Sequence, residues 1–493
     1  MNSVARQPKV VGRISNPSIE CDRATDGLEI RPTSTMSRRL FLQRAAGGLA
    51  AGLLAGPASL LAQIAGERPK PADGVTVLNP LGRVPVSLII DDSTCLVNLN
   101  RFAVPQFAEA FKGQGRYDHD WRKWPHEIPD EFVKKFGEWC GERGVKGKYS
   151  VVPFPACVGR LDRGLPGWTK KELDDSLNLV RTLLLPNWDI HPEMVTHTRV
   201  IDIDTGHPYP DINPNFMENW DWAVGKSAAQ IADYLAYALT ILKNVGLPCE
   251  GITTPGGFGN RAVPELSQAV LLACRDVFAT EIPHYFKFLI SQGKESVAPR
   301  IEYASGLDTA EPKCVVRIIG CTGDWTGGWD CSDKGDVDKF ITADLKRGRA
   351  VEIIERGEPC LLFGHWTGFY WHGEEHGYKV FQEAVRRITE RYPNLLWMKL
   401  TEVARYWAAK ELTRFDRAGE VVSISAPFAA PQFTVRVASR REAIPKLTCL
   451  DKPVALREAA SSAKLQPATW TRDGDGVIVC FDLPKGRSKM EFS

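Results

Sequence analysis

The sequence lacks several features that would mark large classes of protein. Its 62 basic and 60 acidic residues nearly cancel, leaving a formal net charge of +2, so no overall field favours nucleic acid or an anionic membrane as a partner. None of the twelve cysteines forms a Cys-x-x-Cys pair, which excludes a zinc ribbon and a dithiol redox motif. No internal repeat or low-complexity tract stands out. The 493 residues have globular composition and are numerous enough for one large domain and a smaller one.

The N-terminal region carries a basic pair followed by a weakly apolar stretch. Arg38 and Arg39 precede Leu40-Phe41-Leu42 and the uncharged residues 45–65, which are rich in Ala, Gly and Leu. This order resembles a twin-arginine export signal. Five Gly and Pro residues within the stretch weigh against the alternative, a transmembrane anchor. We therefore expect an extension and signal over 1–66, contact with the twin-arginine translocation machinery, and a periplasmic or extracellular protein whose true start is Met36.

The rest of the chain divides into three parts. Residues 67–79 are predicted to be a linker. Over 80–412, apolar runs alternate with amphipathic helical segments, which is typical of β/α units. Seven or eight strands are expected, at about 86–90, 148–153, 188–198, 249–254, 277–280, 315–320, 360–365 and 395–398. Residues 413–493 alternate in the manner of strands, and 477–483 and 488–492 are predicted to form a hairpin. We expect a small β-sandwich-like domain there that caps the larger one or binds sugar, with capping favoured.

Two adjacent carboxylates end the first strong apolar run. Val86–Ile90 reads as a strand buried on both faces, and Asp91 and Asp92 follow it. Two acids are costly to bury unless they are paired or bind a metal. In a β/α barrel, the carboxyl ends of the strands carry the chemistry. The pattern favours a metal-dependent enzyme in which one carboxylate is a ligand and the other a base, with an ordinary Asp-Asp turn as the alternative.

The strand-end residues, taken in order, resemble those of the polysaccharide deacetylase superfamily of carbohydrate esterases over residues 80–412. The resemblance implies an incomplete (β/α) barrel of seven or eight strands with a metal site at its mouth. It makes Asp91 the catalytic base and Asp92 a metal ligand. His197, within Thr196-His197-Thr198, corresponds to an imidazole ligand. The next expected ligand position holds Ile201, so Asp202 is the candidate substitute, and a divalent metal, zinc above all, is the implied cofactor.

Further motifs of the resemblance fall on later strand ends. Thr253 stands where the family has an arginine that orients the base, and Pro255 and Gly256 correspond to a groove wall. Asp324 and Trp325, with Trp329 nearby, match a groove-lining motif loosely. His365 ends an apolar run and corresponds to the general acid, a role that suits the pKa of histidine. Trp366, beside it, is a further candidate substrate-binding residue.

These residues lead us to expect an exported hydrolase that removes N- or O-acyl groups from a polysaccharide or amino sugar polymer. Two alternatives remain open. The missing second-motif ligand and the missing arginine favour a non-catalytic glycan-binding protein on the same scaffold. A metal-independent glycoside hydrolase would use two carboxylates, with Asp324 as the second acid. Disulfides form in exported proteins, and a bridge between Cys321 and Cys331 is possible.

Overall fold

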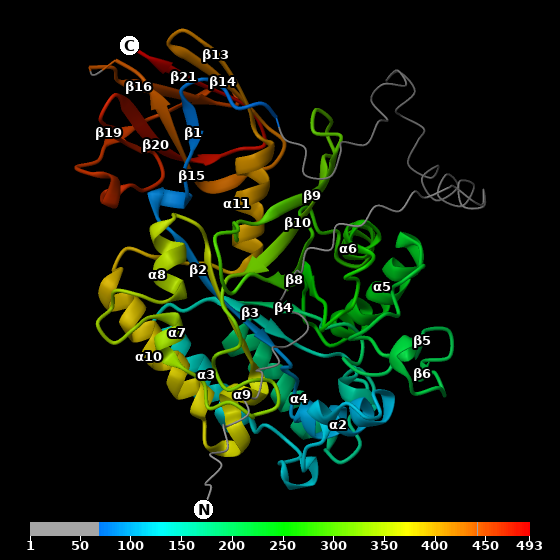
Figure 1. The fold of residues 1–493 in the computed structure, drawn as a ribbon. Coiled ribbons are helices and arrows are strands. Elements are labelled where there is room, and N and C mark those ends of the chain that lie inside the picture. The colour runs from blue at the N-terminus through cyan, green and yellow to red at the C-terminus, as the bar shows by residue number, and fades with distance from the viewer. Residues whose placement is uncertain (1–68, 441) are drawn as a thin grey trace, which may run out of the picture.

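The parallel strands that the sequence predicts lie in two sheets of a mixed α/β fold (Figure 1). The structure is a computed structural model, and it describes residues 69–440 and 442–493. The expected export signal therefore lies outside the described residues. Within the described part of the chain, no helix is both long enough and apolar enough to cross a membrane.

The first sheet has the order β11-β2-β3-β4, and β12 also pairs with β2. All of these pairings are parallel. The strands are β2 (Pro85–Asp91), β3 (Gly147–Ser150), β4 (Trp188–His191), β11 (Cys360–His365) and β12 (Leu396–Trp397). Every residue of β2 is buried, as a strand covered on both faces requires.

The second sheet has the order β7-β8-β10-β9. Its strands β7 (Gly251–Thr253), β8 (His284–Leu289) and β10 (Lys313–Gly320) are parallel, and β9 (Arg300–Ser305) is antiparallel to β10. Two links join the sheets. Glu193 forms a parallel bridge with Thr253, and Cys321 N donates to Leu361 O at 2.8 Å.

Helices cover these strands and mostly follow the amphipathic segments of the sequence. They are α2 (Leu99–Ala110), α3 (Asp130–Glu142), α4 (Lys170–Leu179), α5 (Ala228–Asn244), α6 (Val263–Phe278), α7 (Val337–Phe340), α8 (Arg349–Glu355), α9 (Trp366–Tyr370), α10 (His376–Arg391) and α11 (Leu400–Leu412). Ser227 caps α5, as its position before the apolar stripe indicates, and forms a capping box with Gln230. The strand predicted at 277–280 is wrong. Val277 belongs to the last turn of α6, and the strand forms later, as β8, because a short apolar run does not distinguish a helix face from a strand.

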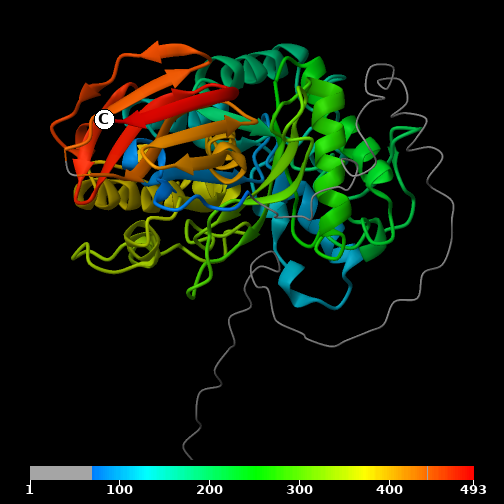
Figure 2. The ribbon, with the colours of Figure 1, turned by 90° about the horizontal axis from the view of Figure 1, so that it is seen from above.

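The C-terminal strands form two five-stranded sheets, with orders β1-β15-β20-β19-β18 and β13-β14-β21-β16-β17. Their members are β1 (Val75–Val77), β13 (Arg414–Ala418), β14 (Val421–Ala426), β15 (Ala430–Ala438), β16 (Pro445–Cys449), β17 (Lys452–Val454), β18 (Arg457–Glu458), β19 (Thr469–Asp473), β20 (Gly476–Leu483) and β21 (Gly486–Phe492). The view in Figure 2 shows most of these strands, in orange and red, together on one side of the molecule.

Two sequence predictions about this region are wrong. The expected linker over 67–79 contains β1, which pairs with β15 and so belongs to a C-terminal sheet. The expected hairpin of 477–483 and 488–492 does not form, because β20 pairs with β15 and β19 whereas β21 pairs with β14 and β16. The turn between them instead carries the chain from one sheet to the other. Both errors concern pairing between segments distant in sequence, which local alternation does not specify.

The C-terminal sheets lie against the amino end of β2. Leu78 N donates to Thr434 O at 2.9 Å, and Leu81 N donates to Thr434 Oγ1 at 2.9 Å. Leu81 lies in η3 (Pro80–Gly82), which directly precedes β2. The carboxyl end of β2, with Asp91, therefore lies at the opposite end of the strand from these sheets.

The cysteines add no cross-link in the described residues, where all eleven are free. Cys321 and Cys331, which could have formed a bridge, contact different partners. Cys321 lies 3.9 Å (Sγ to Sγ) from Cys360, and Cys331 Sγ donates to Thr367 O at 3.4 Å. Burial raises the pKa of Cys331 well above its ordinary value. The expectation of a Cys321–Cys331 disulfide is therefore wrong.

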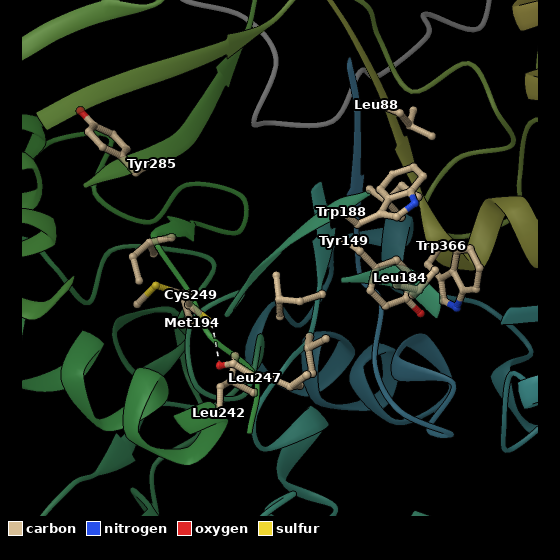
Figure 3. Close-up of a cluster of buried hydrophobic side chains, with 14 of the residues drawn as sticks. Leu88, Tyr149, Leu184, Trp188, Met194, Leu242, Leu247, Cys249, Tyr285 and Trp366 are labelled. Atoms are coloured by element: carbon tan, nitrogen blue, oxygen red, sulfur yellow. Dashed lines mark hydrogen bonds between the residues drawn. The ribbon is translucent and has the colours of Figure 1, made fainter. Parts of the chain in front are cut away.

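Trp366 lies in the core rather than in a binding groove, which corrects its expected role. It is 1% exposed, and its ring centroid lies 4.9 Å from that of Phe132, 5.1 Å from that of Phe136 and 5.2 Å from that of Tyr149. Figure 3 shows Trp366 beside Tyr149 within the buried cluster. Its position just after β11 directs it between the strands and α3.

Replacement of Trp366 by alanine is expected to lower the free energy of unfolding by about 3–5 kcal/mol, because it leaves a large cavity. Urea unfolding measures the change. Leu272→Ala, at a site 41% exposed on α6, is the control and should cost less than about 1 kcal/mol. Unchanged stability in Trp366→Ala would contradict the core assignment.

Candidate metal centre at the strand ends

The carboxyl ends of β2, β4 and β11 place the main candidate residues around one pocket. Asp91 and Asp92 end β2, His365 ends β11, and His197 follows β4; all four line the pocket. Asp91 and His365 are direct partners in the parallel register of β2 and β11. The structure thus brings together residues from three segments that are widely separated in sequence.

The tightest group in this pocket consists of Asp92, Glu193 and His197. His197 Nε2 lies 2.9 Å from Asp92 Oδ1 and 3.3 Å from Glu193 Oε1. The two carboxylate side chains are only 2% and 1% exposed. Asp92 Oδ1 is buried and has no partner among the described residues besides this imidazole. Each of the three residues offers one ligand atom, and these atoms lie within 4.8 Å of one another, a spacing that one cation could bridge.

The backbone of this group is held in an unfavourable conformation. Asp92 has φ of 63° and His197 has φ of 65°, both in the left-handed region. Non-glycine residues there cost about 1–3 kcal/mol each and cluster at functional sites. Asp92 N donates to Glu193 Oε2 at 2.8 Å, and this hydrogen bond holds Asp92 in its left-handed conformation.

A further buried carboxylate, Glu218, fixes the backbone around His197. It accepts from Thr196 N at 2.9 Å and from His197 N at 2.6 Å. Tyr234 OH also donates to it. Burial raises the pKa of Glu218 to about 7 despite these donors. Glu218 touches no ligand atom of the group and therefore acts by positioning the loop.

The pKa shifts of Asp92, Glu193 and His197 indicate that the two buried carboxylates are stabilised by a positive charge beside them. Burial alone would lower the pKa of His197, but Asp92 and Glu193 raise it well above its usual value. Burial alone would raise the pKa of Asp92 and that of Glu193, but His197 lowers both. In the protein without a cation, a protonated His197 is thus the counter-ion of two buried carboxylates.

Asp91 has a different partner, the buried Lys148 of β3. Lys148 Nζ donates to the Asp91 carboxylate, to Ile90 O at 2.7 Å and to Ser150 Oγ at 2.8 Å. Burial and the Glu193 carboxylate raise the pKa of Asp91 to about 7, against the lowering effect of Lys148 and His365. Lys148 therefore supplies beside Asp91 the cation that the resemblance expects from an arginine at Thr253.

Thr253 itself contacts a deeper polar pair. Its Oγ1 lies 3.3 Å from His191 Nδ1, and His191 Nε2 lies 3.0 Å from His284 Nε2. Asp189 lies close enough to complete a second group of possible ligands. Burial lowers the pKa of both histidines, so they are neutral near pH 7. The 3.0 Å separation is that of an N–H···N hydrogen bond, which gives both Nε2 atoms a partner without a cation.

His365 is paired with Asp324. Its Nδ1 lies 2.6 Å from Asp324 Oδ2, and each side chain is 7% exposed. Burial alone would lower the pKa of His365, but Asp324 and Asp92 raise it to about 10. A protonated imidazole at the pocket wall can donate a proton to a bound group.

The other walls of the pocket differ in part from those expected. Gly256 lines it, as do the aromatic residues Phe107, Tyr117, Trp220 and Trp329. Pro255 is buried behind the wall. Trp325 packs on Phe340, with centroids 5.2 Å apart, and does not line the pocket. Asp324 contacts His365 rather than the pocket space. Neither Trp325 nor Asp324 therefore lines the pocket, because Trp325 packs on Phe340 and Asp324 is held by His365.

Asp202 is not part of the group, contrary to expectation. It lies on the hairpin of β5 (Ile201–Asp202) and β6 (His207–Pro208), where its Oδ1 accepts from Asp204 N at 3.0 Å. Glu193 supplies the carboxylate instead. The rule that found Asp91 and Asp92, an acid at the carboxyl end of a buried strand, also applies to Glu193, which lies two residues beyond β4.

Comparisons with known proteins add little. No family model and no curated protein matches the chain. Among solved structures, the catalytic domain of GH30 xylanase C from Talaromyces cellulolyticus aligns with 8% identity and a TM-score of 0.26, over 85% of this chain and 99% of that chain. Similarity at that level carries no argument about function.

Glu218→Ala is expected to lower the free energy of unfolding by roughly 2–5 kcal/mol, because it orphans buried backbone N–H groups. Glu218→Gln keeps an acceptor and should cost less than Glu218→Ala. Glu265→Ala, an exposed acid in the first turn of α6, is the control and should be nearly neutral. Equal stability of Glu218→Ala and the wild type would show that Glu218 does not hold this loop.

Proposed function

We propose that the protein is a metal-dependent hydrolase that removes acyl groups from an amino sugar polymer. The observation that carries the proposal is the arrangement of three groups around one pocket. Asp92, Glu193 and His197 form a ligand set, Asp91 with Lys148 forms a base, and His365 with Asp324 forms an acid. This combination matches the needs of acyl transfer to water.

The fold is interpreted as an incomplete (β/α) barrel. The parallel strands β2, β3, β4, β7, β8, β10 and β11 follow one another around it. The Glu193–Thr253 bridge links β4 to β7, and the hydrogen bond from Cys321 N to Leu361 O links β10 to β11. The two C-terminal sheets form a sandwich-like cap at the amino ends of the strands. Catalytic residues at the carboxyl ends accord with such a barrel. Export by the twin-arginine route is part of the same proposal.

The ligand set fits a divalent cation of the zinc type. Histidine nitrogen and carboxylate oxygen are among its usual ligands, and the only group that contacts Asp92 Oδ1 among the described residues is the imidazole of His197, itself a candidate ligand. Asp92, Glu193 and His197 would hold the cation, with His197 neutral. A cation held there supplies Lewis acidity, which polarises an acyl carbonyl and makes water a better nucleophile.

The chain's own residues supply the proton transfers. Asp91, with a pKa of about 7, can take a proton from the attacking water. Lys148 holds the Asp91 carboxylate at the pocket wall. His365, kept protonated by Asp324, can give a proton to the leaving nitrogen or oxygen. The partly exposed rings of Trp220 and Trp329 line the pocket and offer apolar surface to sugar rings.

A metal-independent glycoside hydrolase is the second candidate. Asp91 and Glu193 both line the pocket, and their environments push their pKa values apart, upward for Asp91 and downward for Glu193. An acid and a nucleophile need such a difference. Asp324 does not fill the second role, since it binds His365. A chelator that leaves glycan cleavage intact would favour this candidate, and metal binding without any hydrolysis would favour a glycan-binding protein.

The purified mature protein is expected to contain one equivalent of a zinc-type ion. His197→Ala should lose it, because it removes the only nitrogen ligand. Elemental analysis measures the content, and His207→Ala, on the exposed turn of β6, is the control that should keep it. Wild-type protein that stays metal-free after incubation with Zn²⁺ would contradict the proposal.

The rate of acetate release from an acetylated chitooligosaccharide should show a bell-shaped dependence on pH. Asp91 must be ionised and His365 protonated, so the rate rises through about pH 7 and falls through about pH 10. Asp324→Asn removes the charge that raises the pKa of His365 and should move the alkaline limb down by roughly 1–3 pH units. Asp333→Asn, an exposed acid of the same loop, should leave the profile unchanged. An alkaline limb that does not move in Asp324→Asn would exclude His365 as the acid.

A further inference from the structure

Lys287 enters the pocket through an irregularity in β8. In the parallel register of β8 and β10, Ile318 is opposite Phe286, whereas Ile319 is opposite Phe288. Lys287 is therefore the extra residue of a bulge. Bulges re-aim side chains and are common next to active sites. The Lys287 side chain lines the same pocket as Asp91 and His365.

The amine of Lys287 is buried with little compensation. The residue is 2% exposed, and the one hydrogen bond of its Nζ is to Gly256 O at 2.9 Å among the described residues. An ammonium group has three donors. Burial alone accounts for the lowered pKa of Lys287, about 7, with no acidic neighbour contributing. A buried cation without a counter-ion is costly, and a bound anion would relieve that cost.

The acids of the pocket already have partners. Asp91 binds Lys148, and His197 lies between Asp92 and Glu193. Asp330 lies 3.3 Å (Oδ2 to Nε2) from His119. None of them is left to neutralise Lys287.

Arg116 is a second cation at the pocket, from η4 (Gly115–Tyr117). Its guanidinium donates to Tyr117 OH, and its Cζ lies 4.5 Å from the centroid of that ring. No carboxylate pairs with Arg116 within the described ranges. The pocket therefore presents two basic side chains, Lys287 and Arg116, that no carboxylate of the described residues pairs with.

We propose that Lys287, assisted by Arg116, forms an anion subsite that binds a carboxylate carried by the substrate sugar. The inference rests on the proposed function and narrows its substrate class to acidic glycans, in which a sugar bears a carboxylate as a lactyl ether or as a uronic acid. Lys287 would donate to the carboxylate from inside the pocket, beside the site of hydrolysis. The subsite explains why the chain keeps an amine at a buried bulge.

Matched ligands that differ only in charge test the subsite. N-Acetylmuramic acid and its methyl ester, and glucuronic acid and its methyl ester, are titrated calorimetrically into the full chain, with and without a chelator. At least one acid should bind about tenfold more tightly than its ester, and the pair that shows this identifies the source of the carboxylate. Lys287→Met should abolish the difference, and Lys287→Arg should keep part of it. Lys294→Met, an exposed lysine of the following loop, should behave as wild type.

Lys287→Met should fold, because an apolar chain of similar volume replaces an uncompensated buried charge. Equal affinity for acid and ester in both pairs, or no binding of any of the four, would overturn the subsite. A charge preference that survives in Lys287→Met would also overturn it. This test is separate from the test of hydrolysis. A preference for the acid over the ester, without metal binding or deacylation, would contradict only the proposed function. Deacylation without that preference would contradict only the subsite.

Discussion

The site depends on the placement of His197 between two buried carboxylates. Asp92 and Glu193 are almost inaccessible to water, and neither could stay ionised there without positive charge close by. The imidazole meets both at 2.9 and 3.3 Å. Several features hold this contact in place. They are the left-handed backbone at Asp92 and His197, the hydrogen bonds from the backbone around His197 to Glu218, and the turn after β2. The two buried carboxylates and the two left-handed residues lower the stability of the folded protein. In return, they concentrate negative charge at one point, which a site for a cation requires.

Two further ionisable residues at the pocket, Asp91 and His365, each have a separate partner of opposite charge. Lys148 balances Asp91, and Asp324 balances His365. The two pairs leave neighbouring residues with different proton affinities, a pKa of about 7 for Asp91 and of about 10 for His365. Lys287 and Arg116 are exceptions, because neither has an acidic partner within the described part of the chain. The parallel strands make this arrangement possible, since their carboxyl ends bring residues from across the sequence to one edge.

The sequence predicted the parts of the site that follow directly from strand ends. Asp91, Asp92 and His365 terminate buried apolar runs, and the structure sets them at one pocket together with His197. Glu193 was missed because it lies two residues beyond its strand, and Lys148 because a lysine within a strand is expected to face solvent. Asp202 and Trp366 were assigned by proximity in sequence, and Trp325 by a loose match to a motif. Neither criterion determines the face on which a side chain lies. The pairing of β1 with β15 and the separation of β20 from β21 depend on contacts between distant segments, and local patterns do not encode them.

The most direct test of the account is a crystal structure with anomalous diffraction data collected at the zinc absorption edge after addition of Zn²⁺. The account predicts one strong anomalous peak about 2.0–2.2 Å from His197 Nε2 and from carboxylate oxygens of Asp92 and Glu193, with the Asp91 carboxylate nearby but still bound to Lys148. An ordered pocket without a peak, or a peak only elsewhere in the molecule, would contradict the central claim that these three side chains form a metal centre.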